Sequence, residues 1–110
     1  QAAELAKVFD NIMIASNGEA FKSIEYLTED QVSLHSPFVD PTKPYINPSF
    51  RENYWKLPVS RATSIQSTAN NIYSINSRMR GKYMVIKLVG DSQKMQYVKS
   101  VITGLRNSKS

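Results

Sequence analysis

The stretch KYMVIKLVGDSQKMQYVKSVITGL, residues 82–105, carries the clearest structural pattern in the chain. Its first eight residues are mostly apolar on both alternating faces, which is typical of a central strand covered on two sides. Gly90-Asp91-Ser92 then breaks the alternation, and Asp91 or Ser92 is a suitable helix N-cap. Apolar residues recur beyond it at helical spacing: Met95, Val98, Ile102 and Leu105. The pattern predicts a strand followed by a final helix that packs on the sheet.

Further strands are expected upstream of this stretch. A strand over residues 72–79 precedes it, and Arg80-Gly81 is expected to form the tight connection, because glycine can take positive φ. Residues 65–68 form another candidate strand, followed by a turn at Asn70-Asn71. The last third of the chain therefore predicts an antiparallel set of strands.

The first segment predicts an amphipathic helix within residues 1–15, which would be able to pair with another helix. Its apolar residues recur at i, i+3, i+4, i+7 and i+8 and form one stripe: Leu5, Val8, Phe9, Ile12 and Met13. Ser16-Asn17-Gly18 then breaks the pattern. Either a second short helix with Phe21, Ile24 and Leu27 follows, or one longer helix tolerates Gly18.

The middle of the chain predicts two short strands around a loop. Val32, Leu34, Ser36 and Phe38 alternate, so they are expected to form the buried face of a strand, with His35 on the opposite, exposed face. Three prolines make residues 40–48 a Pro-rich loop. Trp55, Leu57 and Val59 alternate again, but Pro58 confines that strand to a sheet edge.

These elements predict one α+β domain over residues 1–110. The sheet is expected to be antiparallel or mixed, with helices on one face. A chain of 110 residues fits a single domain and can bury roughly two-thirds of its unfolded surface, so it needs no disulfide or metal for stability.

The charge of the chain is unevenly distributed. Residues 1–60 carry five basic and eight acidic side chains, whereas residues 61–110 carry nine basic side chains and one acid, Asp91. This asymmetry favours an acidic partner for the C-terminal half, such as nucleic acid, lipid headgroups or an acidic protein face. The alternative is that the two halves fold against each other and cancel much of the field.

The residues that enzymes need are mostly missing. The chain has no cysteine and one histidine, His35, so neither a nucleophile–base pair with a Gly-flanked serine nor a His/Cys zinc site can be assembled. The glycines have no phosphate-binding spacing. The candidate acid–base carboxylates are expected in turns, loops or exposed faces: Glu25, Glu29, Asp30, Asp40 and Glu52. The sequence thus predicts no enzyme, cofactor or metal.

Binding is the expected activity, and three groups of residues are candidates for it. The stripe of Leu5, Val8, Phe9 and Ile12 would pair with a like domain. Tyr45 and Trp55, in and after the Pro-rich loop, would anchor an interface, unless Trp55 folds back into the core. Arg78, Arg80 and Lys82 cluster at the expected hairpin tip and would contact an acidic partner.

The segment NIYSINSRMRGKYMVIKLVGDSQKMQYVKSVITGLRNS, residues 71–108, resembles the periplasmic ferredoxin-like domains of bacterial type IV pilus and type II secretion inner-membrane assembly proteins. The helix expected around residues 5–13 is similar to the coiled-coil stalk of those proteins. The resemblance implies a ferredoxin-like two-layer sandwich that forms homo- or heterodimers and has no catalytic residues. The long Pro-rich loop and the missing closing strand depart from the family pattern.

The leading functional expectation is therefore a non-catalytic scaffold domain of an envelope-spanning pilus or secretion machine. It would act at the periplasmic face of the inner membrane, held there by a segment not present in this sequence. One alternative is a cytoplasmic nucleic-acid-binding domain that uses the basic C-terminal half. A second alternative is an extracytoplasmic ligand-sensing domain in which the aromatic loop forms a pocket wall.

Overall fold

The computed structural model describes residues 7–66, 75–91, 93 and 98–107. Within those residues the chain is built from β-strands and one short 3₁₀ turn, η2 (Pro44–Ile46). The strands are β1 (Lys7–Ser16), β2 (Ser23–Leu27), β3 (Gln31–His35), β4 (Ser49–Arg51), β5 (Tyr54–Pro58), β6 (Ser64–Ile65), β7 (Arg80–Gly81), β8 (Val85–Val89) and β9 (Val98–Asn107). They form two antiparallel sheets, here named sheet A and sheet B.

Sheet A is organised around the long strand β1. Strand β9 pairs with β1 from Lys7 to Ser16, whereas β5 pairs with residues 11–15 and β7 with residues 7 and 8. Because a strand has two edges, β9 occupies one edge of β1, and β5 and β7 occupy successive parts of the other. Strand β4 pairs with the outer edge of β5.

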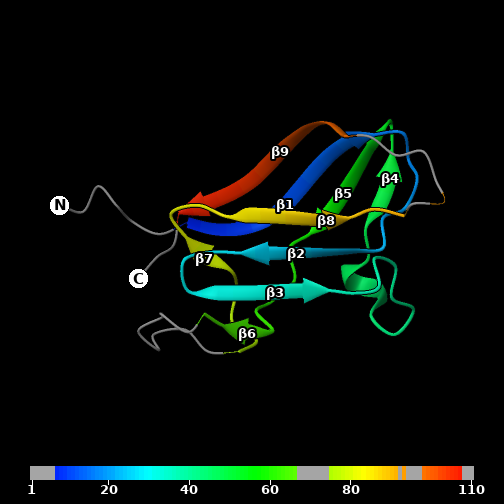
Figure 1. Ribbon diagram of the computed structural model, residues 1–110. Coiled ribbons are helices and arrows are strands. Elements are labelled where there is room, and N and C mark those ends of the chain that lie inside the picture. The colour runs from blue at the N-terminus through cyan, green and yellow to red at the C-terminus, as the bar shows by residue number, and fades with distance from the viewer. Residues whose placement is uncertain (1–6, 67–74, 92, 94–97, 108–110) are drawn as a thin grey trace.

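Sheet B has the strand order β6-β3-β2-β8. Figure 1 shows its three longer strands stacked in front of the strands of sheet A, which cross them at an angle. This arrangement is a two-layer β-sandwich.

The core lies between the two sheets. Sheet A contributes Ile12, Ile14, Trp55 and Leu57, and sheet B contributes Ile24 and Tyr26 with the half-buried Ile86 and Leu88. Burial raises the pKa of the Tyr26 hydroxyl far above its ordinary value. At one end of the sandwich the ring of Phe38 packs edge-on against Phe21 at 5.5 Å and against Trp55 at 5.1 Å between centroids.

A buried glutamine joins sheet B to the segment that leads into β7. Gln31 is fully buried; its Nε2 donates to Ser77 Oγ and to the Arg78 carbonyl, each at 2.9 Å. Its Oε1 accepts a hydrogen bond from the Arg80 amide at 2.8 Å. Because β7 pairs with β1, this one side chain holds the connection between the two layers in place.

The α+β prediction was wrong, and with it the ferredoxin-like sandwich. The stripe of Val8, Phe9 and Ile12 lies in strand β1, and the segment expected to form a second short helix is β2. The expected final helix is β9 over Val98–Asn107; Leu5 and Met95 lie outside the described residues. No helix in the described ranges is long and apolar enough to cross a membrane.

The helical spacing in residues 5–13 has a local cause in the strand. The pairing of β1 with β9 shifts register between Phe9 and Asn11, so Asp10 forms a β-bulge. The bulge interrupts the two-residue alternation, and the buried residues Phe9 and Ile12 fall three positions apart, a spacing otherwise typical of a helix.

Composition explains the error at the C-terminal end. Residues 101–103, Val-Ile-Thr, are all β-branched and favour a strand, and Gly104 weakens a helix. Gly104 pairs with Asn11 directly beside the bulge, a position at which glycine is common in strands.

Other local predictions had mixed outcomes. Strands do occur in the segments predicted from alternation at residues 32–38 and 55–59 and from the apolar run at residues 82–89. Strand β5 lies inside sheet A, but Pro58 is its last residue, beyond the part that β4 covers. Arg80-Gly81 is not a hairpin turn but strand β7, and the turn expected at residues 70–71 lies outside the described residues.

Candidate interaction surface

The residues predicted to bind partners lie in three different environments. Val8, Phe9 and Ile12 are buried in β1, with Ile12 in the core, so they do not form an exposed stripe. Trp55 is also buried, and its ring contacts Phe38 and Phe50, which is the folded-back arrangement considered as the alternative. Tyr45 projects from η2 with 78% of its surface exposed.

The predicted basic cluster is interleaved with acidic groups. Arg78 forms an ion pair with Asp10 at 2.9 Å. The backbone amide of Lys82 donates to both carboxylate oxygens of Glu29, at 3.0 and 3.2 Å. The ion pairs Asp10–Arg78 and Glu25–Lys87 each join the acidic first half of the chain to the basic second half. The halves thus fold against each other, as the alternative interpretation of the charge asymmetry proposed.

Strand β3 presents its side chains in the opposite sense to the predicted one. Gln31, Ser33 and His35 face inward and are buried, whereas Val32 is half-buried and Leu34 is 50% exposed. The inward polar groups have partners: Ser33 Oγ lies 2.6 Å from Ser60 Oγ, and His35 Nε2 lies 3.0 Å from the Phe38 carbonyl oxygen. Because the polar side chains of β3 form hydrogen bonds in the interior, the apolar side chains of β3 lie on the outer side.

Strand β8 adds more apolar side chains to that outer side. It was expected to be a central strand, but among the described residues it pairs only with β2 and forms an edge of sheet B. Val85 and Val89 point outward and are 51% and 49% exposed, while Ile86 and Leu88 point to the core. The outer face of sheet B is defined here by Glu25, Leu27, Val32, Leu34, Val85, Lys87 and Val89.

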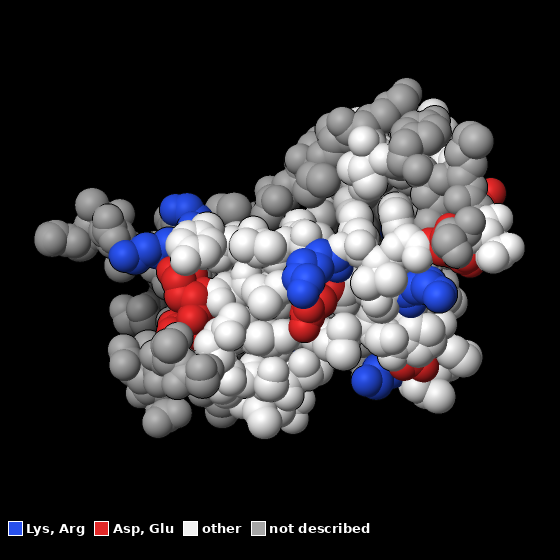
Figure 2. Space-filling view, viewed as in Figure 1, with Lys and Arg blue, Asp and Glu red and all other residues white. Residues whose placement is uncertain are grey.

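The outer face carries little charge. Figure 2 shows the side of the molecule that sheet B covers as largely white, with blue and red atoms together near its middle. The charged pair on this face is Lys87 of the edge strand β8 and Glu25 of the neighbouring strand β2, with Nζ and Oε1 3.5 Å apart. This apolar face is a candidate interaction site.

A groove of about 670 Å³ lies beside the outer face. It is lined by residues of β1 around the bulge, by the end of β3, by η2 and by the segments 58–63 and 76–79. Three of the predicted binding residues meet there, Phe9, Tyr45 and Arg78, together with Arg61 and Lys43, which the sequence analysis did not single out. Leu34 belongs both to the groove and to the outer face, so the two surfaces are continuous.

Within the described ranges, no group of three or more His, Cys, Asp or Glu side chains is placed to hold a metal ion. The pKa of the Asp40 carboxyl is lowered because the Thr42 hydroxyl and the Thr42 amide donate hydrogen bonds to it. Asp40 is a loop residue at the surface, and its hydrogen bonds explain its low pKa without a catalytic role.

Comparison with protein-family models, with curated protein sequences and with solved structures found no match for this chain. The resemblance to the pilus and secretion assembly proteins therefore stays a prediction from sequence, without its ferredoxin-like fold.

Proposed function

We propose that this chain is a non-catalytic assembly domain that forms a dimer through the outer face of sheet B. The proposal is carried by the inverted strand β3, in which Leu34 faces out and His35 faces in. A strand with its apolar side chains at the surface loses the stabilisation that their burial in its own domain would provide. A partner that covers this face would bury them and recover that stabilisation.

The register of β2 and β8 makes the outer face self-complementary. Leu27 pairs with Val85, and Glu25 pairs with Lys87. A twofold axis parallel to the strands, between β2 and β8, lays β8 of one copy over β2 of the other. Val85 then lies over the partner's Leu27, and Lys87 lies over the partner's Glu25, so apolar groups and opposite charges meet.

The size of the face predicts a weak and reversible dimer. The three five-residue strands β2, β3 and β8 lie about 4.8 Å apart, with a rise of about 3.3 Å per residue, so they cover roughly 240 Å². Stable interfaces bury about 800 Å² on each partner, so this face alone supports weaker association. We expect a dissociation constant of about 10–100 µM, a range suited to a module that is repeated in a larger assembly.

A charge-swap experiment tests the dimer. Lys87→Glu gives each copy two acidic groups at the centre of the face, and Glu25→Lys gives two basic groups. Each variant alone is expected to dimerise about tenfold more weakly than the wild type in sedimentation velocity runs, because like charges face each other. An equimolar mixture of the two variants should recover the dimer, because every acid then faces a base.

A second pair of variants tests the apolar part of the face. Val85→Asp should abolish dimerisation, whereas Val39→Asp, which charges an equally exposed valine in a loop outside the sheets, should not. The proposal is refuted if the wild type stays monomeric up to about 1 mM, or if the mixed charge variants associate no better than each variant alone. The expected role in a pilus or secretion machine is a separate prediction, tested by locating the protein in its cell.

A further inference from the structure

The groove beside the outer face brings two arginines together. The Ala62 amide donates to the Ser77 carbonyl at 2.9 Å, and the Asn76 amide donates to the Ala62 carbonyl at 2.8 Å. These two bonds pair the segments 60–63 and 75–78, so Arg61 and Arg78 occupy neighbouring positions on adjoining chain segments. Both line the groove.

Each guanidinium is anchored and keeps further donors. Arg61 Nη1 donates to the Asn76 carbonyl at 3.0 Å, and Arg78 Nη1 donates to Asp10 Oδ1 at 2.9 Å. Asn76 has a φ of 73°, a left-handed conformation that asparagine tolerates better than most residues. A guanidinium carries five N–H donors. The guanidiniums of Arg61 and Arg78 each donate one hydrogen bond among the described residues, so both have donors left to bind a carboxylate.

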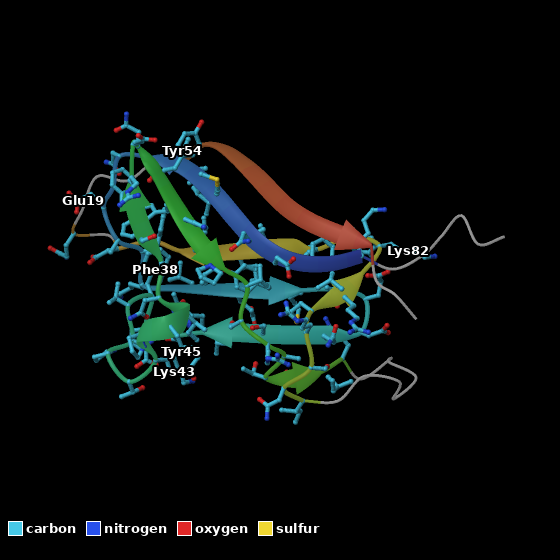
Figure 3. All side chains as sticks on the ribbon, turned by 180° about the vertical axis from the view of Figure 1, so that it is seen from behind. Glu19, Phe38, Lys43, Tyr45, Tyr54 and Lys82 are labelled. Atoms are coloured by element: carbon cyan, nitrogen blue, oxygen red, sulfur yellow. The ribbon has the colours of Figure 1, made fainter. Side chains whose placement is uncertain are left out.

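The charge of the groove favours an anionic ligand. Among the described residues that line it, Lys43 is a third cation and Asp10 is the one acid. Figure 3 shows Lys43 and Tyr45 together at η2, next to the end of β3. Two arginines at neighbouring positions repel each other, and the single charge of the Asp10 carboxylate does not neutralise two guanidiniums, so a carboxylate from a ligand would offset the remaining positive charge.

The apolar lining restricts the class of anion. Leu34, Ile46, Val59 and Met79 lie in the same groove as the arginines. A phosphodiester chain would meet this apolar surface and the Asp10 carboxylate, whereas a peptide can place an acidic side chain on the guanidiniums and apolar side chains beside them. The volume of about 670 Å³ is within the usual range for sites that hold a small ligand or a few residues.

We propose that this groove binds an extended peptide segment whose glutamate or aspartate side chains pair with Arg61 and Arg78. The inference goes beyond the dimer and does not depend on it, because neither arginine belongs to the outer face of sheet B. Bidentate pairing with arginine supplies orientation as well as affinity, and the neighbouring apolar groups select among acidic sequences.

The probe is an acetylated and amidated hexapeptide, Gly-Leu-Glu-Leu-Glu-Gly, titrated into ¹⁵N-labelled protein and followed by NMR. The Nε–Hε signals of Arg61 and Arg78 should shift, with a dissociation constant of about 0.1–1 mM that rises with salt. Arg61→Gln and Arg78→Gln should each weaken binding about tenfold. Arg51→Gln removes the same charge from β4, outside the groove, and should have no effect.

A peptide with glutamine in place of both glutamates separates charge recognition from apolar binding. If it binds as tightly as the Glu peptide, or if the Glu peptide causes no shift at Arg61 and Arg78 up to about 5 mM, the proposal is overturned. If a thymidine octanucleotide binds these arginines more tightly than the peptide does, the groove belongs to nucleic acid instead. Thermal unfolding of the Arg78 variant checks that loss of the Asp10 pair leaves the fold intact.

Discussion

Gln31→Leu tests whether one buried amide holds the two layers of this protein together. The Gln31 side chain is fully buried and makes three hydrogen bonds, to Ser77 Oγ, the Arg78 carbonyl and the Arg80 amide. Leucine has a similar volume, so the change opens no large cavity, but it leaves these three groups without their partner.

The magnitude follows from the number of bonds that are lost. Each hydrogen bond contributes about 1 kcal/mol, so the free energy of unfolding should fall by about 3 kcal/mol. For a domain of this size that corresponds to a decrease in Tm of roughly 12 °C. Urea denaturation followed by circular dichroism gives the free energy, and hydrogen exchange of the Arg80 amide shows whether the loss arises at this site.

Gln66→Leu is the matched control. The Gln66 side chain makes one long hydrogen bond, from Nε2 to the Thr28 carbonyl at 3.3 Å, so its loss should cost no more than about 1 kcal/mol. If Gln31→Leu is no more destabilising than this control, or if the Arg80 amide exchanges at an unchanged rate, the role assigned to Gln31 is wrong.

Three further changes test other parts of the structure. Gly18→Ala should reduce the free energy of unfolding by about 1–2 kcal/mol in urea, because φ is 87° there and a Cβ would lie 3.0 Å from the Phe50 ring. Ile12→Ala should cost about 2–5 kcal/mol in the same assay, since Ile12 is fully buried between the sheets. The lowered pKa of Asp40 stabilises the folded protein above the ordinary carboxyl pKa, and this contribution is lost as pH falls through the lowered value; Thr42→Val should raise that pKa in an NMR titration.

Some of the short strands were predictable from the sequence, whereas the two long ones were not; of the short ones, β2 was expected to be a helix and β7 a tight turn. Alternation over a few residues located β3 and β5, and a run that is mostly apolar on both faces located β8. The two ten-residue strands, β1 and β9, were both assigned to helices. In β1 the bulge at Asp10 produces a three-residue spacing, and in β9 the β-branched residues 101–103 were a local signal that the apolar spacing outweighed.

The residues that line the proposed binding groove were predicted only in part. Tyr45 and Arg78 were candidates because an aromatic residue beside prolines and a cluster of basic residues are typical of interfaces. Arg61 carried no such signal, because it stands in no charged run. Its role depends on the pairing of residues 60–63 with residues 75–78, a contact that sequence periodicity does not reveal.

The orientation of β3 explains why the apolar outer face could not be predicted from the sequence. Alternation divides the residues of β3 into a polar set and an apolar set. The polar set is Gln31, Ser33 and His35, and the apolar set is Val32 and Leu34. Hydrophobicity alone assigns the apolar set to the core. The structure reverses this because the first set finds partners inside, among them the three bonds of Gln31. These hydrogen bonds fix the register of β3. A shift of β3 by one residue would bury Leu34, but it would leave the Arg80 amide without its hydrogen-bond acceptor. The hydrogen bonds that join the two layers therefore also place the apolar side of β3 at the surface, where the dimer is proposed to form.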